Sequence, residues 1–199
     1  GSGTFSSLTI GDGGFADPGA SPGTMNSTFT AWDGGGTYLW EINSATGTAG
    51  MDPGWDLWNT GTLTIGATDL NPFTISLNTL DSGNTPGFLD TWNASSNYSW
   101  LIATSTNGAF ASLTGLVLDF SDFLNSLGGG FSLASGAGGN ELYVNFTAAS
   151  GPSPVPEPSS LVLLACAAGG LFAGYRRRRR VAGQVREQNE VPMPVSSKA

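Results

Sequence analysis

Short runs in which apolar and polar residues alternate recur through the first 148 residues, and they limit the fold more than any other feature of the sequence. In "TYLWEIN" the side chains of Tyr38, Trp40 and Ile42 fall on one face. Similar runs are "GTLTIG", "FTISLNTL" and "ELYVNFT". A period of two over such lengths is typical of strands that bury one face. The sequence therefore predicts an all-β domain over residues 1–148.

Proline and glycine separate these runs. The chain has 30 Gly among 199 residues, and we expect the Gly of each Pro-Gly pair (Gly19, Gly23 and Gly54) to supply the positive φ of a tight turn. Units of strand and turn return about every 12 to 25 residues, which fits both the rungs of a solenoid and the hairpins of a β-sandwich. Spacing alone does not choose between these two folds.

One stretch departs from the period of two. In "DFSDFLNSLGGG" four apolar residues from Phe120 to Leu127 fall at i, i+3, i+4 and i+7. This spacing predicts a short helix over about residues 121–127, with Ser121 as the cap of its first turn. Packed on the edge of the sheet, such a helix would shield a strand from pairing with other chains.

Basic side chains are confined to the end of the chain. The seven Lys and Arg all lie at Arg176 or beyond, whereas thirteen of the fifteen acids precede it, so residues 1–175 carry a formal charge of −13. A domain without cations cannot replace the counterions of a nucleic acid, which excludes nucleic acid as a partner. The chain has no His and one Cys, which excludes His-based catalytic and zinc sites and an intramolecular disulfide.

Asp52 and Asp56 are the strongest acid–base candidates. In "MDPGWDLW" they lie beside Trp55 and Trp58. Paired carboxylates flanked by Trp are what a glycoside hydrolase uses, because one acid of raised pKa and aromatic platforms for sugar rings are needed. The interpretation that we favour is that Asp52 begins a turn, Asp56 faces water and the Trp rings cover a sheet face. We therefore expect no catalytic residue and no enzymatic activity.

Aromatic side chains are also candidates for stacking on a polysaccharide. Trp55 and Trp58 are the candidate glycan-binding residues, and other aromatic residues would serve if they are exposed. These others include Trp32, Trp92, Tyr98 and Trp100. The negative charge of the domain favours a neutral glycan over an acidic polymer, which makes exopolysaccharide a candidate partner.

Two further acids, Asp12 and Asp17, lie in Gly-rich turns that could supply oxygen ligands to calcium. Their segment, "GDGGFAD", lacks the spacing of acids found in an EF-hand and the nonapeptide repeat of calcium-binding β-rolls. We therefore expect no metal site and no cofactor.

The chain beyond residue 148 divides into three segments. Residues 149–158 are rich in Pro and form a stiff linker. Residues 159–175 carry no charge and would span roughly 25 Å as a helix, close to the thickness of a bilayer core. Residues 176–199 open with a basic cluster and continue as a polar tail that we expect to be disordered. The cluster is Arg176, Arg177, Arg178, Arg179 and Arg180. These charges resist translocation, so we expect them to set the topology by remaining cytoplasmic.

Pro156, Glu157 and Pro158, followed by the apolar run and the Arg cluster, resemble the PEP-CTERM sorting signal of bacterial proteins over residues 155–180. The resemblance implies an exported protein that the helix anchors transiently in the inner membrane. It also implies that an exosortase, a membrane-embedded peptidase, recognises the three residues and cleaves nearby, so that the helix and the Arg cluster are discarded. The product would lie at the cell surface or outside the cell.

Residues 4–147 resemble the C-terminal region of surface proteins that carry autotransporter-associated β-strand repeats, especially those of planctomycete-type bacteria. The resemblance rests on "SPGT" at 21–24, "YLWEI" at 38–42 and "DPGWD" at 52–56. It implies that these residues are the end rungs and cap of a right-handed parallel β-helix, and no enzymatic activity comes with it. A β-sandwich is the alternative fold.

The sequence thus predicts an exported bacterial surface or extracellular-matrix structural protein, delivered and cleaved through its C-terminal signal. A carbohydrate-binding module that uses exposed Trp residues is the first alternative. A glycosidase that works through Asp52 and Asp56 is the second.

Overall fold

The computed structural model describes residues 4–150 apart from residue 20. The last strand of this part ends at Ala148. Most of the predicted linker, the predicted membrane helix over residues 159–175 and the tail over residues 176–199 lie outside the described residues.

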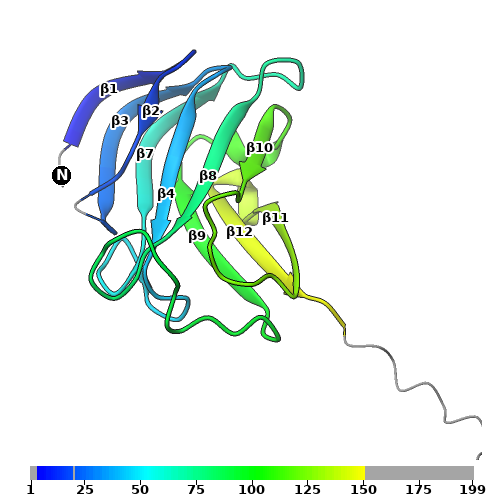
Figure 1. The fold of residues 1–199 in the computed structure, drawn as a ribbon. Helices are drawn as coiled ribbons and strands as arrows, with labels where there is room; N and C mark the ends of the chain where they lie inside the picture. The colour runs from blue at the N-terminus through cyan, green and yellow to red at the C-terminus, as the bar shows by residue number, and fades with distance from the viewer. Residues whose placement is uncertain (1–3, 20, 151–199) are drawn as a thin grey trace, which may run out of the picture. The chain divides into compact units, whose positions relative to one another are not determined.

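The described residues are mostly β and form two mixed sheets of six strands each (Figure 1). Sheet A contains, in spatial order, β1 (Thr4–Ile10), β3 (Thr24–Trp32), β7 (Leu57–Ile65), β9 (Tyr98–Thr104), β12 (Glu141–Ala148) and β11 (Gly129–Ser135). Sheet B contains β10 (Leu116–Asp119), β8 (Phe73–Thr79), β4 (Thr37–Ile42), β6 (Gly54–Trp55) and β5 (Thr48–Ala49), and β2 (Phe15–Ala16) pairs with β4.

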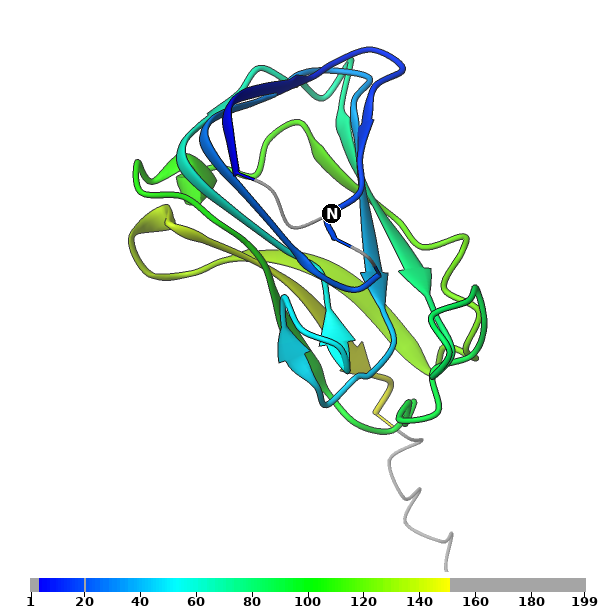
Figure 2. The same ribbon diagram turned by 90° about the vertical axis from the view of Figure 1, so that its left-hand side faces the viewer.

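The chain alternates between the two sheets as it advances. Strands β1, β3, β7 and β9 pair in parallel in sheet A, while β2, β4, β8 and β10 pair in parallel in sheet B. Figure 2 views the described part from the β1 side, where successive strands of each sheet lie one behind another. At the other end, β12 pairs antiparallel with both β9 and β11.

The predicted alternation is confirmed where it was most regular. Tyr38, Trp40 and Ile42 are fully buried, and the intervening residues of β4 are partly exposed. Strands β8 and β12 bury the predicted face in the same way. The inward faces of the two sheets therefore supply one hydrophobic core.

Aromatic rings fill this core. Trp32 stacks on Phe73 with ring centroids 4.7 Å apart, and Trp58 lies edge-on to Tyr38 at 5.4 Å. The indole nitrogen of Trp58 donates a hydrogen bond to Ser27 Oγ at 3.2 Å. Large rings buried with a partner for the N–H group contribute both apolar area and specific geometry.

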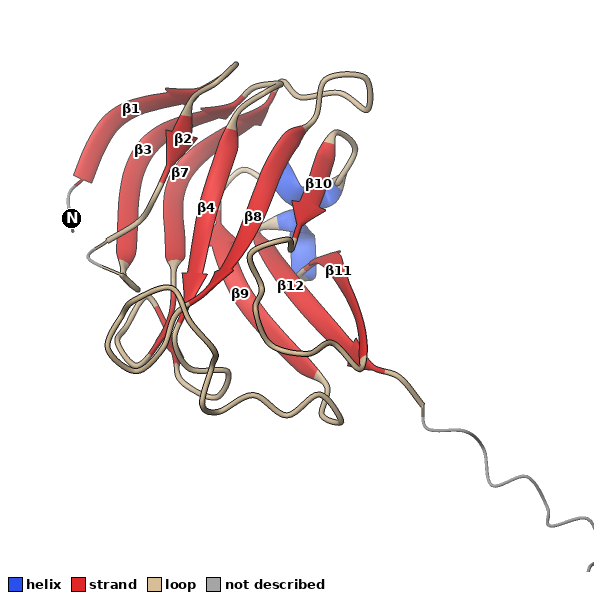
Figure 3. Cartoon of the chain, in the orientation of Figure 1, coloured by secondary structure: helices blue, strands red, loops and turns tan. Residues whose placement is uncertain are grey.

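The helix predicted over residues 121–127 is wrong, because this segment is a series of turns (Figure 3). Its backbone amides find partners elsewhere: Leu124 N donates to Thr79 Oγ1 at 3.0 Å. The Asn125 side chain both accepts from Leu89 N and donates to Leu89 O. Side chains of Ser, Thr, Asn and Asp offer such bonds in place of those of a helix, and Gly disfavours a helix through its backbone entropy. The helical elements of the described residues are two 3₁₀ turns, η1 (Ala109–Ala111) and η2 (Ala137–Gly139).

The expectation for the Pro-Gly pairs holds at one position of three. Gly19 has a φ of 94°, but Gly23 and Gly54 do not adopt positive φ. Gly54 lies in β6 beside β5, where an added Cβ would overlap the carbonyl oxygen of Thr48. At Gly54 the chain therefore needs the small size of glycine rather than its conformational freedom.

Candidate functional site

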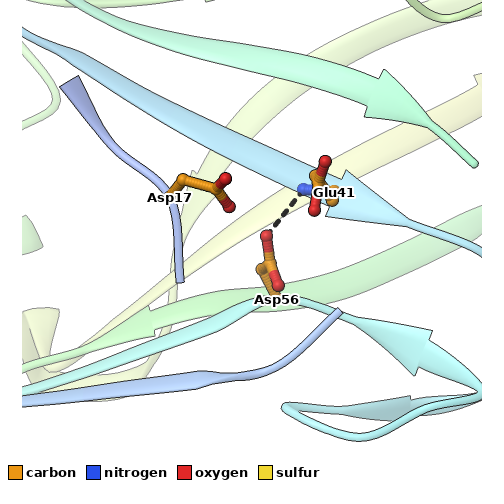
Figure 4. A group of neighbouring side chains, drawn as sticks. All are labelled: Asp17, Glu41 and Asp56. Carbon is orange, nitrogen blue, oxygen red and sulfur yellow. Dashed lines mark hydrogen bonds between the residues drawn. The ribbon is translucent and has the colours of Figure 1, made fainter. Parts of the chain in front are cut away.

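Three acidic residues from different segments meet at one place, and we call them the carboxylate cluster: Asp17, Glu41 and Asp56. Asp17 follows β2, Glu41 belongs to β4, and Asp56 lies between β6 and β7. One oxygen from each carboxyl group lies within 4.8 Å of the others, and Figure 4 shows the Asp17 carboxyl group directed toward the other two residues.

Strand pairing explains this convergence. In the parallel β2–β4 pair, Ala16 lies opposite Tyr38, so Asp17 lies opposite the next residue of β4. In the β4–β6 pair, Ile42 lies opposite Trp55, so Asp56 comes beside Glu41. The cluster therefore depends on the order of strands in sheet B.

Asp56 is fully buried, and its polar groups are occupied. Its Oδ1 accepts a hydrogen bond from Gly23 N at 2.7 Å, and its Oδ2 accepts one from Glu41 N at 2.9 Å. Its carbonyl oxygen accepts from Trp40 Nε1 at 2.9 Å. Asp56 therefore joins β4 to the segment before β3 and to the aromatic core.

Burial raises the pKa of Asp56 to about 8, although the two amide hydrogen bonds from Gly23 and Glu41 act to lower it. The charges of Glu41 and Asp17 raise it further. Burial also raises the pKa of Glu41, opposed by the Ser21 hydroxyl that donates to its Oε2, and burial raises the pKa of Asp17. Near neutral pH, the Asp56 carboxyl group is therefore mainly protonated.

Among the residues that the structure describes, no Lys, Arg or His side chain faces the cluster, since residues 1–175 contain none. Its charge is relieved when a proton stays on Asp56. Carboxylate oxygens are also the ligands that hard cations such as calcium take, although both oxygens of Asp56 already accept amide hydrogen bonds. The arrangement suits retention of a proton on Asp56. The carboxylate oxygens of Asp17 and Glu41 are more accessible than those of Asp56.

Asp52 lies in a different environment from Asp56. It is exposed, and its two oxygens accept hydrogen bonds of 2.7 Å from Asn43 Nδ2 and Asn84 Nδ2. These bonds lower the pKa of Asp52. Asn43 also accepts from Gly54 N at 2.8 Å, so Asp52 helps to hold the turn between β5 and β6. The favoured interpretation of Asp52 as a turn residue is confirmed, whereas the expectation that Asp56 faces water is wrong.

The candidate glycan-binding residues are not an exposed pair. Trp58 is 1% exposed, so its ring presents no face to a glycan. Trp55 is partly buried, and its indole N–H donates to Leu101 O at 2.9 Å. Trp32 and Trp100 are buried as well, whereas Trp92 and Tyr98 are partly buried and stack on each other at 5.2 Å.

The sequence identified Asp17 and Asp56, but in different hypothetical sites, and it missed Glu41. Asp12, the predicted calcium partner of Asp17, is exposed and is not a member of the carboxylate cluster. Glu41 occupies an outward position of β4, which alternation predicts as an ordinary surface residue. The lack of Lys, Arg and His in residues 1–175 was the available signal, since a buried acid there has no basic side chain of the same domain to pair with.

One comparison with known proteins gives a match: residues 154–180 fit the model of the PEP-CTERM protein-sorting motif. The match supports export as a membrane-anchored precursor and sorting by an exosortase to the cell surface. It covers the predicted recognition residues and the Arg cluster.

No curated protein and no solved structure matches the chain. The resemblance of residues 4–147 to autotransporter-associated β-strand repeat proteins is thus without support from these comparisons. Within residues 4–150, residue 20 aside, no helix has the length and hydropathy needed to cross a bilayer. The predicted span over residues 159–175 lies beyond that part.

Proposed function

We propose that this chain is a non-enzymatic structural protein of a bacterial cell surface or extracellular matrix, cleaved by an exosortase-type peptidase after export. The sorting motif at residues 154–180 is the observation that carries the proposal. Pro156, Glu157 and Pro158 are the residues that the peptidase reads, and the Arg cluster keeps the end of the precursor cytoplasmic.

The β domain is, in this proposal, the end turns and cap of a right-handed parallel β-helix. Two features support it. Successive strands of each sheet pair in parallel as the chain alternates between sheets, and the antiparallel β11–β12 pair follows the last such turn. The mixed sheets are also compatible with a sandwich of two facing layers.

A structural role suits the chemistry of the described residues better than catalysis. Both carboxyl oxygens of Asp56 accept hydrogen bonds from backbone amides, and those of Asp52 accept from two Asn side chains. The two acids of the predicted glycosidase pair therefore each serve a structural role. Exopolysaccharide remains a candidate partner of the exported domain.

Processing is tested by producing the full chain with and without the cognate exosortase and measuring the intact mass. We expect the active enzyme to remove the residues beyond the Pro156–Pro158 motif. An unchanged C-terminus in the presence of active enzyme would overturn the proposed cleavage.

The recognition residue is tested with Glu157→Gln, and Glu187→Gln in the tail is the matched control. Both variants remove one carboxylate and keep the size of the side chain. We expect the Glu157 variant to stay uncleaved and the Glu187 variant to be cleaved like the natural chain. Equal cleavage of both would remove Glu157 from the recognition motif.

A further inference from the structure

The outer face of sheet B carries a groove of about 370 Å³. Its floor is formed by β4 and β8, where Glu41 lies opposite Asn78 and both side chains are partly exposed. Leu39 lies two residues before Glu41 and therefore shares its face of the sheet. The groove thus lies on the side of sheet B that faces away from the aromatic core.

Two turns form the walls of the groove. Leu80 and Pro86 pair across the turn that follows β8. After β10 the chain returns to the end of β8, where Thr79 N and Oγ1 donate to Asp122 O at 3.3 and 3.4 Å, and Leu124 N donates to Thr79 Oγ1 at 3.0 Å. These bonds hold Asp122 and Leu124 beside the outward residues of β4 and β8.

The free polar groups of the groove are hydrogen-bond acceptors. Asn78 Nδ2 donates to Ser76 O at 3.0 Å, so the amide of Asn78 presents its oxygen to a ligand. Glu41 Oε2 accepts from the Ser21 hydroxyl, whereas Glu41 Oε1 and both carboxyl oxygens of Asp122 have no hydrogen-bond donor among the described residues. A ligand must therefore supply the donors.

The charge of the groove selects a cation. Glu41 and Asp122 line the groove, and an oxygen of Asp17 lies within 4.8 Å of an oxygen of Glu41. Residues 1–175 contain no Lys, Arg or His, so no basic side chain of the described residues balances these carboxyl groups. A bound cation is attracted by the summed field of the acidic domain as well as by the groove itself.

The apolar part of the lining distinguishes between kinds of cation. Four apolar side chains contribute to it: Leu39, Leu80, Pro86 and Leu124. Leu124 is 46% exposed. A metal ion takes oxygen ligands and makes no use of such a surface. A lysine side chain does use it, since its flexible four-carbon stem covers apolar groups while the ammonium group offers three N–H donors and no acceptor.

We infer that the groove binds a lysine side chain of another protein. The ammonium group lies among the acceptors of Glu41, Asn78 and Asp122, and the stem lies along Leu124. The single Lys of the chain, Lys198, belongs to the tail that the proposed topology keeps cytoplasmic, so the lysine comes from a partner outside the cell. The choice of partner thus rests on the proposed function, whereas binding in the groove is independent of sorting and of cleavage.

The test titrates the peptide acetyl-Ala-Lys-Ala-amide into the isotope-labelled full chain in a nonionic detergent. Backbone and side-chain amide signals in the NMR spectrum report which residues the peptide reaches. The matched peptide carries Nε-acetyl-lysine, which keeps the stem and loses the charge. We expect the lysine peptide to shift the signals of Asn78 and Leu124, and the acetylated peptide to bind about tenfold more weakly.

Two pairs of variants separate the groove from the general charge of the domain. Glu41→Gln and Asp122→Asn should each weaken binding about fivefold, because each removes a charged acceptor. Glu141→Gln and Asp90→Asn remove the same charges outside the groove and should change the affinity less than about twofold. Asp122 is exposed, so its variant tests the groove even if Glu41→Gln disturbs the carboxylate cluster.

Several results would overturn the inference. Unmoved signals at Asn78 and Leu124 would place the lysine elsewhere, and equal weakening by all four variants would assign the attraction to the net charge of the domain. Equal binding of the acetylated peptide would leave an apolar contact alone. Tighter binding of a glucosamine oligomer would assign the groove to an amino sugar. A change of the groove signals in Lys198→Gln without peptide would assign it to the tail of the same chain.

Discussion

Glu41 and Asp56 are joined by a reciprocal pair of hydrogen bonds. The amide of Glu41 donates to Asp56 Oδ2 at 2.9 Å, and the amide of Asp56 donates to the carbonyl oxygen of Glu41 at 2.9 Å. This geometry fixes a buried carboxyl group beside a second acid in a domain without a basic residue. A proton retained on Asp56 thus removes the charge that a nearby Lys or Arg would balance in most proteins.

The first prediction concerns pH. The pKa of Asp56 is about 8 in the folded protein against an ordinary 3.8, so between these values the folded state binds one proton more than the unfolded state. Its contribution to stability is complete below the unfolded pKa and is lost as pH rises through the folded pKa. The free energy of unfolding should fall by up to about 1.4 kcal/mol per pH unit across this window.

Urea unfolding at several pH values, with a chelator present to remove cations, measures this slope. Asp56→Asn should flatten it, and at low pH the same change should cost about 1–3 kcal/mol because one backbone amide loses its acceptor. Asp52→Asn is the control, since the exposed Asp52 has a lowered pKa. An unchanged slope in the Asp56 variant would show that another group carries the proton.

The second prediction concerns close packing in sheet B. Gly54→Ala should destabilise the domain by about 3 kcal/mol, because the new methyl group meets the backbone of Thr48 and cannot be relieved by a side-chain rotation. Gly130→Ala, whose added Cβ meets nothing within 4 Å, should change stability by about 0.5 kcal/mol or less. Equal urea midpoints for the two variants would contradict the close approach of β5 and β6.

The third prediction concerns the aromatic core. Trp58→Ala should cost about 3–5 kcal/mol, because it empties the space between Trp32 and Tyr38. Phe29→Ala removes a ring that is 55% exposed, and it should cost less than about 1 kcal/mol. Thermal and urea unfolding compare the two variants. A larger loss at Phe29 would mean that the inward face of sheet A is assigned wrongly.

The fourth prediction separates a turn segment from a helix at residues 121–127. Asn125→Ala should cost about 1–2 kcal/mol, since its side chain makes two hydrogen bonds to Leu89. Ser121→Ala should change stability by less than about 0.5 kcal/mol, whereas loss of a helix cap would cost about 1 kcal/mol. If urea unfolding showed a larger loss of stability for Ser121→Ala than for Asn125→Ala, the helix would be favoured over the turns.

The buried faces of β4, β8 and β12 could be predicted from the sequence, because alternation reports directly which side chains share a face. Tyr38, Trp40 and Ile42 are examples. The same reasoning failed for residues 121–127, where the spacing of four apolar residues matched a helical period although no helix forms. Hydrogen bonds that involve the side chains of Thr79 and Asn125 hold this segment in turns instead.

The carboxylate cluster could not be predicted from spacing. Asp17, Glu41 and Asp56 become neighbours only once β2 and β6 both lie beside β4, and strand order is not encoded in local periodicity. The pair that looked closest in sequence, Asp52 and Asp56, is divided by β6, with one acid exposed and the other buried. Closeness in sequence was therefore a poorer predictor of which acids meet than the order of strands in sheet B.

Strand β12, which leads out of the domain at Ala148, is paired on both sides: seven of its positions lie opposite β11 and six lie opposite β9. Antiparallel hydrogen bonds run perpendicular to the strands, so tension applied along β12 loads both ladders together in shear instead of opening them one bond at a time. A protein held at a surface through the segment after β12 would thus be tethered by a strand that is paired on both sides, and flow or contact forces would reach the core without first peeling an edge.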